Sequence, residues 1–121
     1  MTTPAKVFSA YLDAFTGGDL ERAFALVADD FDFHGPMLQS KGKAAFVEGA
    51  SGLGPIVKGH DMLRQWSDGD EACSIYDFKI ETPLGKASIT MTEWVQVRDG
   101  KLARSRLVFN TPQFAALMPS E

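Results

Sequence analysis

The sequence predicts an α+β fold in which helices come first and cover one face of a mostly antiparallel sheet. Apolar residues recur at helical spacing from Val7 to Phe15, whereas polar and apolar residues alternate, as in β-strands, from Val57 onward. Tight-turn signals divide this second part at Asp68-Gly69, Pro83-Leu84-Gly85 and Asp99-Gly100. Strands joined by such short turns run antiparallel, so a meander is expected there.

The first helix is expected to begin at Thr3-Pro4 and to end at Gly17-Gly18, because a hydroxyl caps helices and glycine ends them. Asp19 is expected to cap a second helix, with Leu20, Ala23, Phe24 and Val27 as its apolar stripe. The remaining predictions are a strand over residues 30–35, a weaker helix over 42–50, a loop over 50–55, strands near 57–67, 71–82, 86–98 and 101–111, and a last helical turn over 114–118.

Length and charge limit the possible classes of protein. The 121 residues fit a single domain, 1–121, and the net charge of -4 with scattered basic residues argues against a nucleic-acid partner. The longest apolar run, residues 23–28, is too short to span a membrane. Cys73 is the one cysteine and cannot form an internal disulfide, which indicates a reducing, cytoplasmic location.

The third strand of the meander carries the strongest site signal. Alternation places Glu93 among apolar residues on one face of this strand, with Ile89, Met91, Val95 and Val97. Burial there would raise the pKa of Glu93 and turn the neutral acid into a hydrogen-bond donor. The alternative is that a buried tyrosine hydroxyl or a backbone amide simply satisfies Glu93.

Tyr11 is the second candidate, because its place on the apolar stripe of the first helix brings a hydroxyl to the same interior. The alternative is a core tyrosine with a satisfied hydroxyl. Side chains on the inner faces of the neighbouring elements are predicted to contact a small apolar molecule: Phe15, Phe33, Tyr76, Phe78, Met91, Val95, Ser105, Leu107 and Phe109.

Other arrangements are weaker. Asp30, Asp32 and His34 share a strand face, but their spacing spreads them along the strand, so a solvated face is expected and no metal site. The glycines of segment 49–54 are followed by no Lys-Ser or Lys-Thr, so no phosphate site is expected. No cofactor is predicted.

Two groups of residues carry a resemblance to a known family. Tyr11, Gly17-Gly18-Asp19-Leu20, Ala28-Asp29-Asp30 and Gly35-Pro36 resemble the opening of ketosteroid isomerases and of the SnoaL-like group, within the nuclear transport factor 2-like superfamily. The segments Glu93-Trp94-Val95 and Asp99-Gly100-Lys101 resemble the closing strands of that group. The resemblance implies a cone-shaped α+β fold with a strongly curved sheet and an apolar pocket.

The resemblance also implies roles for single residues. Tyr11 and Glu93 match the tyrosine and the protonated acid that form the oxyanion hole of the isomerases. The general base of the isomerases falls at Gly35, which cannot accept a proton. His34 is adjacent and titrates in a suitable range, although alternation points it to the opposite face from Phe33.

Two functions follow. The first is an isomerase- or cyclase-type enzyme that stabilises an enolate with Tyr11 and neutral Glu93, with His34, Tyr76 or a bound water moving the proton. The second is a non-catalytic ligand-binding or dimerisation module. The outer sheet face is expected to mix Ile75, Trp94, Leu102 and Val108 with Thr90, Thr92, Arg104 and Arg106, a pattern typical of interfaces. The resemblance implies a back-to-back homodimer through that face.

Overall fold

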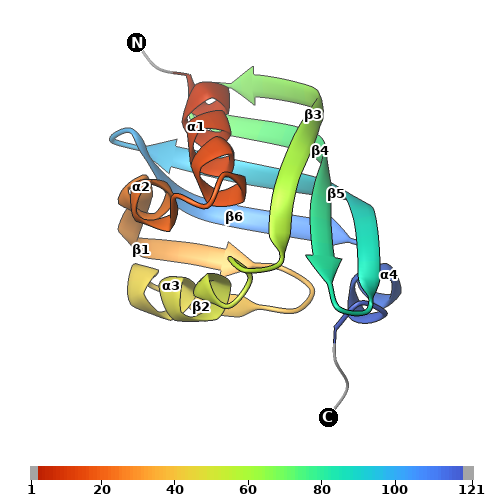
Figure 1. Ribbon diagram of the computed structural model, residues 1–121. Helices are drawn as coiled ribbons and strands as arrows, with labels where there is room; N and C mark the ends of the chain where they lie inside the picture. The colour runs from red at the N-terminus through yellow and green to blue at the C-terminus, as the bar shows by residue number, and fades with distance from the viewer. Residues whose placement is uncertain (1–2, 119–121) are drawn as a thin grey trace.

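The computed structural model describes residues 3–118, and these form one curved sheet with helices packed against it (Figure 1). The elements, in chain order, are α1 (Pro4–Thr16), α2 (Leu20–Ala25), β1 (Val27–His34), β2 (Gln39–Lys41), α3 (Lys43–Ser51), β3 (Val57–Asp68), β4 (Glu71–Thr82), β5 (Gly85–Arg98), β6 (Lys101–Phe109) and α4 (Thr111–Ala115).

The sheet has the strand order β2-β1-β6-β5-β4-β3. Strands β3 to β6 form the predicted antiparallel meander, and β2 also pairs antiparallel with β1. The pair β1–β6 is parallel, because the chain crosses the whole sheet between these two strands. Helices α1, α2 and α3 lie against the same face of the sheet (Figure 1). The predicted class, α+β with a mostly antiparallel and strongly curved sheet, is confirmed.

The start signals of the first two helices act as the sequence predicts. The Thr3 side chain accepts a hydrogen bond from the amide of Lys6, and the Asp19 side chain accepts one from the amide of Arg22. Gly18, between the two helices, adopts a φ of 87°, which a side chain would disfavour. The apolar stripe of α1 is buried: Val7, Phe8, Tyr11, Leu12 and Phe15.

Several element boundaries differ from the prediction. Strand β1 begins at Val27, not at residue 30, because Val27 pairs with Leu102 of β6 and therefore leaves the predicted second helix. The helix α3 reaches Ser51 inside the predicted loop, and the short strand β2 was not predicted. The helix α4 begins at Thr111, three residues before the predicted turn, since the Asn110 side chain caps it.

The predicted outward position of Leu102 is wrong. Leu102 is 1% exposed and lies in the core. Pairing between β5 and β6 moves from Gln96–Arg104 to Val97–Leu102, so one residue of β6, Ala103, has no partner. Such a bulge reverses the alternation of faces beyond it, which strict period-two counting cannot anticipate.

Candidate functional site

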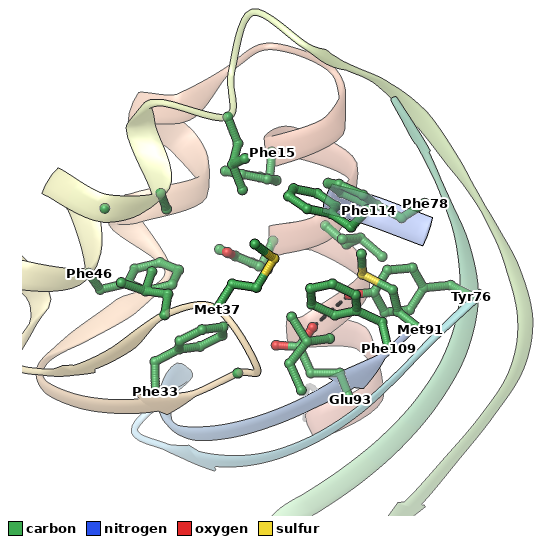
Figure 2. Close-up of a pocket in the computed structure, with 18 of the residues that line it drawn as sticks. Phe15, Phe33, Met37, Phe46, Tyr76, Phe78, Met91, Glu93, Phe109 and Phe114 are labelled. Carbon is green, nitrogen blue, oxygen red and sulfur yellow. Dashed lines mark hydrogen bonds between the residues drawn. The ribbon is translucent and has the colours of Figure 1, made fainter. Parts of the chain in front are cut away.

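A cavity of about 330 Å³ lies between the helices and the covered face of the sheet (Figure 2). Phe33 and Phe46 stand on one side of it, and Tyr76, Phe78 and Met91 stand on the other. The complete lining is Tyr11, Leu12, Phe15, Phe33, Gly35, Met37, Leu38, Phe46, Gly49, Ala50, Leu53, Tyr76, Phe78, Met91, Glu93, Leu107, Phe109, Phe114 and Met118. Most of these side chains are apolar.

The cavity brings together most of the residues predicted to contact a ligand. Phe15, Phe33, Tyr76, Phe78, Met91, Leu107 and Phe109 all line it. Val95 and Ser105 were also predicted to contact a ligand, but neither of them lines the cavity. Both are 0% exposed, so packing leaves no surface on them for a ligand.

The other side of the cavity was not predicted from the sequence. This side comes from the connection between β1 and β2, from α3 and the segment after it, and from α4 and the residues that follow it: Met37, Leu38, Phe46, Ala50, Leu53, Phe114 and Met118. Phe46 lies in α3, which the sequence predicts as a weaker helix over residues 42–50. Ala50 also lies in α3 and Phe114 in the short helix α4. The others, Met37, Leu38, Leu53 and Met118, lie outside helices and strands, where no period indicates which side chains face inward.

Glu93 lies on the inner face of β5, as predicted, and is 5% exposed. The Tyr76 hydroxyl donates a hydrogen bond of 2.7 Å to Oε1 of Glu93, and the Ser105 hydroxyl donates one to Oε2. Burial raises the pKa of Glu93, while the hydrogen bonds from Ser105 and Tyr76 act in the opposite direction. Glu93 therefore combines both alternatives predicted from the sequence. Burial raises its pKa, and the hydroxyl of a buried tyrosine donates a hydrogen bond to it.

Tyr11 also lines the cavity and is buried. Among residues 3–118, no side chain or backbone group forms a hydrogen bond with its hydroxyl. Burial and the nearby charge of Glu93 raise the pKa of Tyr11 well above its usual value. Burial also raises the pKa of Tyr76, followed by the charge of Glu93, the hydrogen bond to Glu93 and the nearby Tyr11. The hydroxyl of Tyr11 is therefore a proton donor that remains protonated at neutral pH.

His34 lies on the opposite face of the sheet. Its Nε2 is 3.3 Å from Oδ1 of Asp32, whose Oδ2 is 3.5 Å from Nη2 of Arg106. His34 does not line the cavity, so this placement gives no support to its predicted role in moving a proton.

Gly35 occupies the wall of the cavity where the resemblance places a general base. A Cβ added to Gly35 would lie 3.1 Å from Cε2 of Phe33 and 3.6 Å from Cβ of Leu107. Any side chain here would press on the Phe33 ring. Glycine has no side chain to accept a proton, so this position cannot supply the base found in the isomerases.

Two further properties concern metals and membranes. Within residues 3–118, no three His, Cys, Asp or Glu side chains lie together in a way that could hold a metal ion. In the same part of the chain, no helix combines the length and the apolar character needed to cross a membrane.

Solved structures with similar folds carry names from the nuclear transport factor 2-like superfamily. A protein named NTF2-like from Burkholderia pseudomallei is 13% identical, with a TM-score of 0.84 over 99% of this chain and 100% of that one. A candidate polyketide cyclase from Silicibacter is 18% identical, with a TM-score of 0.80 over 98% and 96%. A candidate ketosteroid isomerase from Kribbella flavida is 17% identical, with a TM-score of 0.75 over 88% and 77%.

No curated protein matches the chain. The model of the SnoaL-like domain matches residues 8–105, which is most of the sequence and includes most of α1, the meander up to Ser105, Tyr11 and Glu93. These neighbours and this match confirm the resemblance found in the sequence. The chain belongs to the SnoaL-like domain family, within the nuclear transport factor 2-like fold.

Proposed function

We propose that this protein binds a small, mostly apolar molecule in the cavity and holds one oxygen of that molecule with the Tyr11 hydroxyl. The observation that carries the proposal is the unpaired Tyr11 hydroxyl at a cavity with almost wholly apolar walls. Because Tyr11 lines the cavity and no group among the described residues accepts its proton, the hydroxyl can donate to an oxygen of a bound ligand.

The size and the lining of the cavity support a small-molecule ligand. Its volume of about 330 Å³ lies within the range of small-molecule sites, about 300–1,000 Å³. Aromatic rings and methionines dominate the walls, and such side chains favour flat, apolar ligands. The polar side chains of the lining are Tyr11, Tyr76 and Glu93, and they would fix the orientation of a ligand that carries one oxygen.

Enolate stabilisation is the second candidate function. Tyr11 and a protonated Glu93 would both donate to an oxygen on which negative charge develops. The raised pKa of Glu93 and the names of two structural neighbours favour this candidate. Gly35 disfavours it, because enolate formation needs a base and the position of that base carries no side chain. Ligand binding is therefore the function that the geometry supports best.

Binding is tested with 2-naphthol and naphthalene, which share a shape but differ in one hydroxyl. The change Tyr11→Phe removes only the oxygen, so we expect a loss of about 10-fold in affinity for 2-naphthol and none for naphthalene, measured by calorimetry. Leu53→Trp, which fills the cavity, should weaken both ligands. Equal affinity of wild type and Tyr11→Phe for 2-naphthol would contradict the role of Tyr11.

Catalysis is tested separately by hydrogen exchange. Enolate stabilisation predicts that wild-type protein speeds the exchange of the α-hydrogens of 2-tetralone in D₂O, followed by NMR, and that Tyr11→Phe slows it. Exchange at the rate of buffer alone would assign the cavity to binding without catalysis.

A further inference from the structure

The hydroxyls of Tyr76 and Ser105 both lie against the carboxyl group of Glu93. Each hydroxyl carries a single proton, and an ionised carboxylate can only accept. When Glu93 is ionised, Tyr76 donates to Oε1 and Ser105 donates to Oε2, so both protons are committed to Glu93. In this state Tyr11 is the hydroxyl still free to donate to a ligand.

A proton on Glu93 changes this arrangement. The cluster then holds three protons for two contacts, so one hydroxyl must turn its proton away from Glu93. Ser105 is 0% exposed and does not line the cavity, so a proton turned away from Glu93 would find no ligand there. Tyr76 does line the cavity, so its proton can point toward a ligand. Protonated Glu93 would then donate to the Tyr76 oxygen.

We propose that Tyr76 relays a proton: it gives a ligand oxygen a second hydrogen bond beside Tyr11, while the acidic proton of the ligand ends on Glu93. This inference rests on the proposed binding function and names the class of ligand, a weakly acidic hydroxyl compound such as a phenol or an enol. Tyr76 touches the ligand, whereas Glu93 acts through Tyr76.

The proton transfer balances without any further reactant. The O–H bond of the ligand breaks as its proton moves to the Tyr76 oxygen, and the proton of Tyr76 moves along its hydrogen bond to Oε1 of Glu93. No electron is transferred to or from another molecule. The negative charge passes from Glu93 to the ligand oxygen, where Tyr11 and Tyr76 both donate to it, so the net charge of the site is unchanged.

Few other charged groups face this cluster. Tyr11 comes from α1, and the ring of His60 on β3 meets the Tyr76 ring edge-on, with the centroids 6.3 Å apart. The polar atoms of His60 are engaged with α1, where Nδ1 is 2.8 Å from Oγ1 of Thr16 and Nε2 is 3.4 Å from Oδ1 of Asp13. The strand β6 contributes uncharged Ser105, and Glu93 is the one carboxyl among the residues that line the cavity.

The probe for this inference is 4-nitrophenol, whose absorption shifts to longer wavelength when it ionises. At a pH where Glu93 is ionised and free 4-nitrophenol is neutral, we expect the bound probe to show the absorption of the phenolate. Because the proton stays on Glu93, the heat of binding should be the same in buffers of different ionisation enthalpy. The matched ligand 4-nitroanisole has no acidic proton and should bind without any such change.

Two variants separate the parts of the relay. Tyr76→Phe should bind the phenolate roughly 10- to 100-fold more weakly and lose the phenolate absorption of the bound probe. Glu93→Gln cannot take the proton, so any phenolate that binds should release one proton to the buffer. If Tyr76→Phe does not fold, the proton count of the wild type and of Glu93→Gln still decides.

The possible outcomes distinguish the proton relay from the proposed binding of a ligand. A neutral bound probe, a proton released by the wild type, or an unchanged phenolate signal in Tyr76→Phe would overturn the relay. Binding of 4-nitroanisole and of neutral 4-nitrophenol would in that case leave the proposed binding function intact. Binding of neither ligand would overturn the relay and count against the proposed function as well.

Discussion

The carboxyl group of Glu93 shows how one acid is accommodated in an apolar wall. Removing a carboxylate from water favours its neutral form, and this desolvation is the largest influence on the pKa of Glu93. The hydroxyls of Tyr76 and Ser105 replace part of the lost hydration and stabilise the charged form. The net effect is a raised pKa, so Glu93 holds its proton more tightly in the folded protein than in the unfolded chain.

The sign of the resulting pH dependence follows from this direction. A folded pKa above the unfolded one contributes stability that is fully present below the unfolded pKa and is lost as pH rises through the folded pKa. Glu93→Gln keeps the shape of the side chain and removes its titration. We therefore expect the variant to be at least as stable as wild type near neutral pH and to depend less on pH, measured by urea unfolding from about pH 4 to 9.

The control for this prediction is Glu81→Gln, which removes an acid from an exposed site on β4. Its pH dependence should follow that of the wild type. A Glu93→Gln variant that is clearly destabilised at neutral pH would instead show that the charged form of Glu93 supports the fold.

Among the elements, the edge strand β3 is connected to α1 by a partly buried set of hydrogen bonds. The Nε2 of Gln65 lies 3.2 Å from the carbonyl oxygen of Ala5, 3.1 Å from Oγ of Ser9 and 3.0 Å from Oγ of Ser74, and it shares its two protons among these three acceptors. Ser74 lies on β4, is 0% exposed and pairs directly with Glu93 of β5. Gln65 therefore supplies the partner that lets a serine lie in the wall behind the cavity.

Removing Gln65 should leave Ser74 buried without a partner. We expect Gln65→Leu to lower the free energy of unfolding by about 1–3 kcal/mol, because an unsatisfied buried hydroxyl costs about that much. Adding Ser74→Ala removes the orphaned group and should restore most of the loss. Denaturant unfolding of the two single variants and the double variant measures the coupling, and strictly additive effects would contradict a shared set of hydrogen bonds.

The same elements show what a sequence alone can predict. Alternation along β5 placed Glu93 on the inner face, and cap and turn residues located α1 and the three hairpins, because these signals are local. The position of Leu102 was missed because the bulge in β6 depends on pairing with its neighbours. Met37 and Leu38 were missed because irregular segments acquire an inward direction only from tertiary packing.

At the scale of the whole molecule, the two faces of the sheet differ in how they are covered. Helices cover the inner face, whereas the outer face presents Ile75, Trp94 and Val108, with Val108 65% exposed. Cross-strand pairing also places Trp66, 55% exposed, in the same row as Cys73 and Trp94. Acidic and basic side chains surround these apolar groups: Asp32, Glu71, Asp77, Arg64, Arg104 and Arg106.

We expect this outer face to form a homodimer, because a two-fold axis would bury Ile75, Trp94 and Val108 against their copies and let acids of one chain meet bases of the other. A stable interface needs about 800 Å² from each partner. Sedimentation should give a dimer for the wild type at micromolar concentration. Val108→Glu should give a monomer, since two like charges would face each other across the axis, while Leu84→Glu, at a similarly exposed position in the β4–β5 turn, should remain dimeric. A monomeric wild type, or a Val108→Glu variant as dimeric as Leu84→Glu, would contradict the predicted interface.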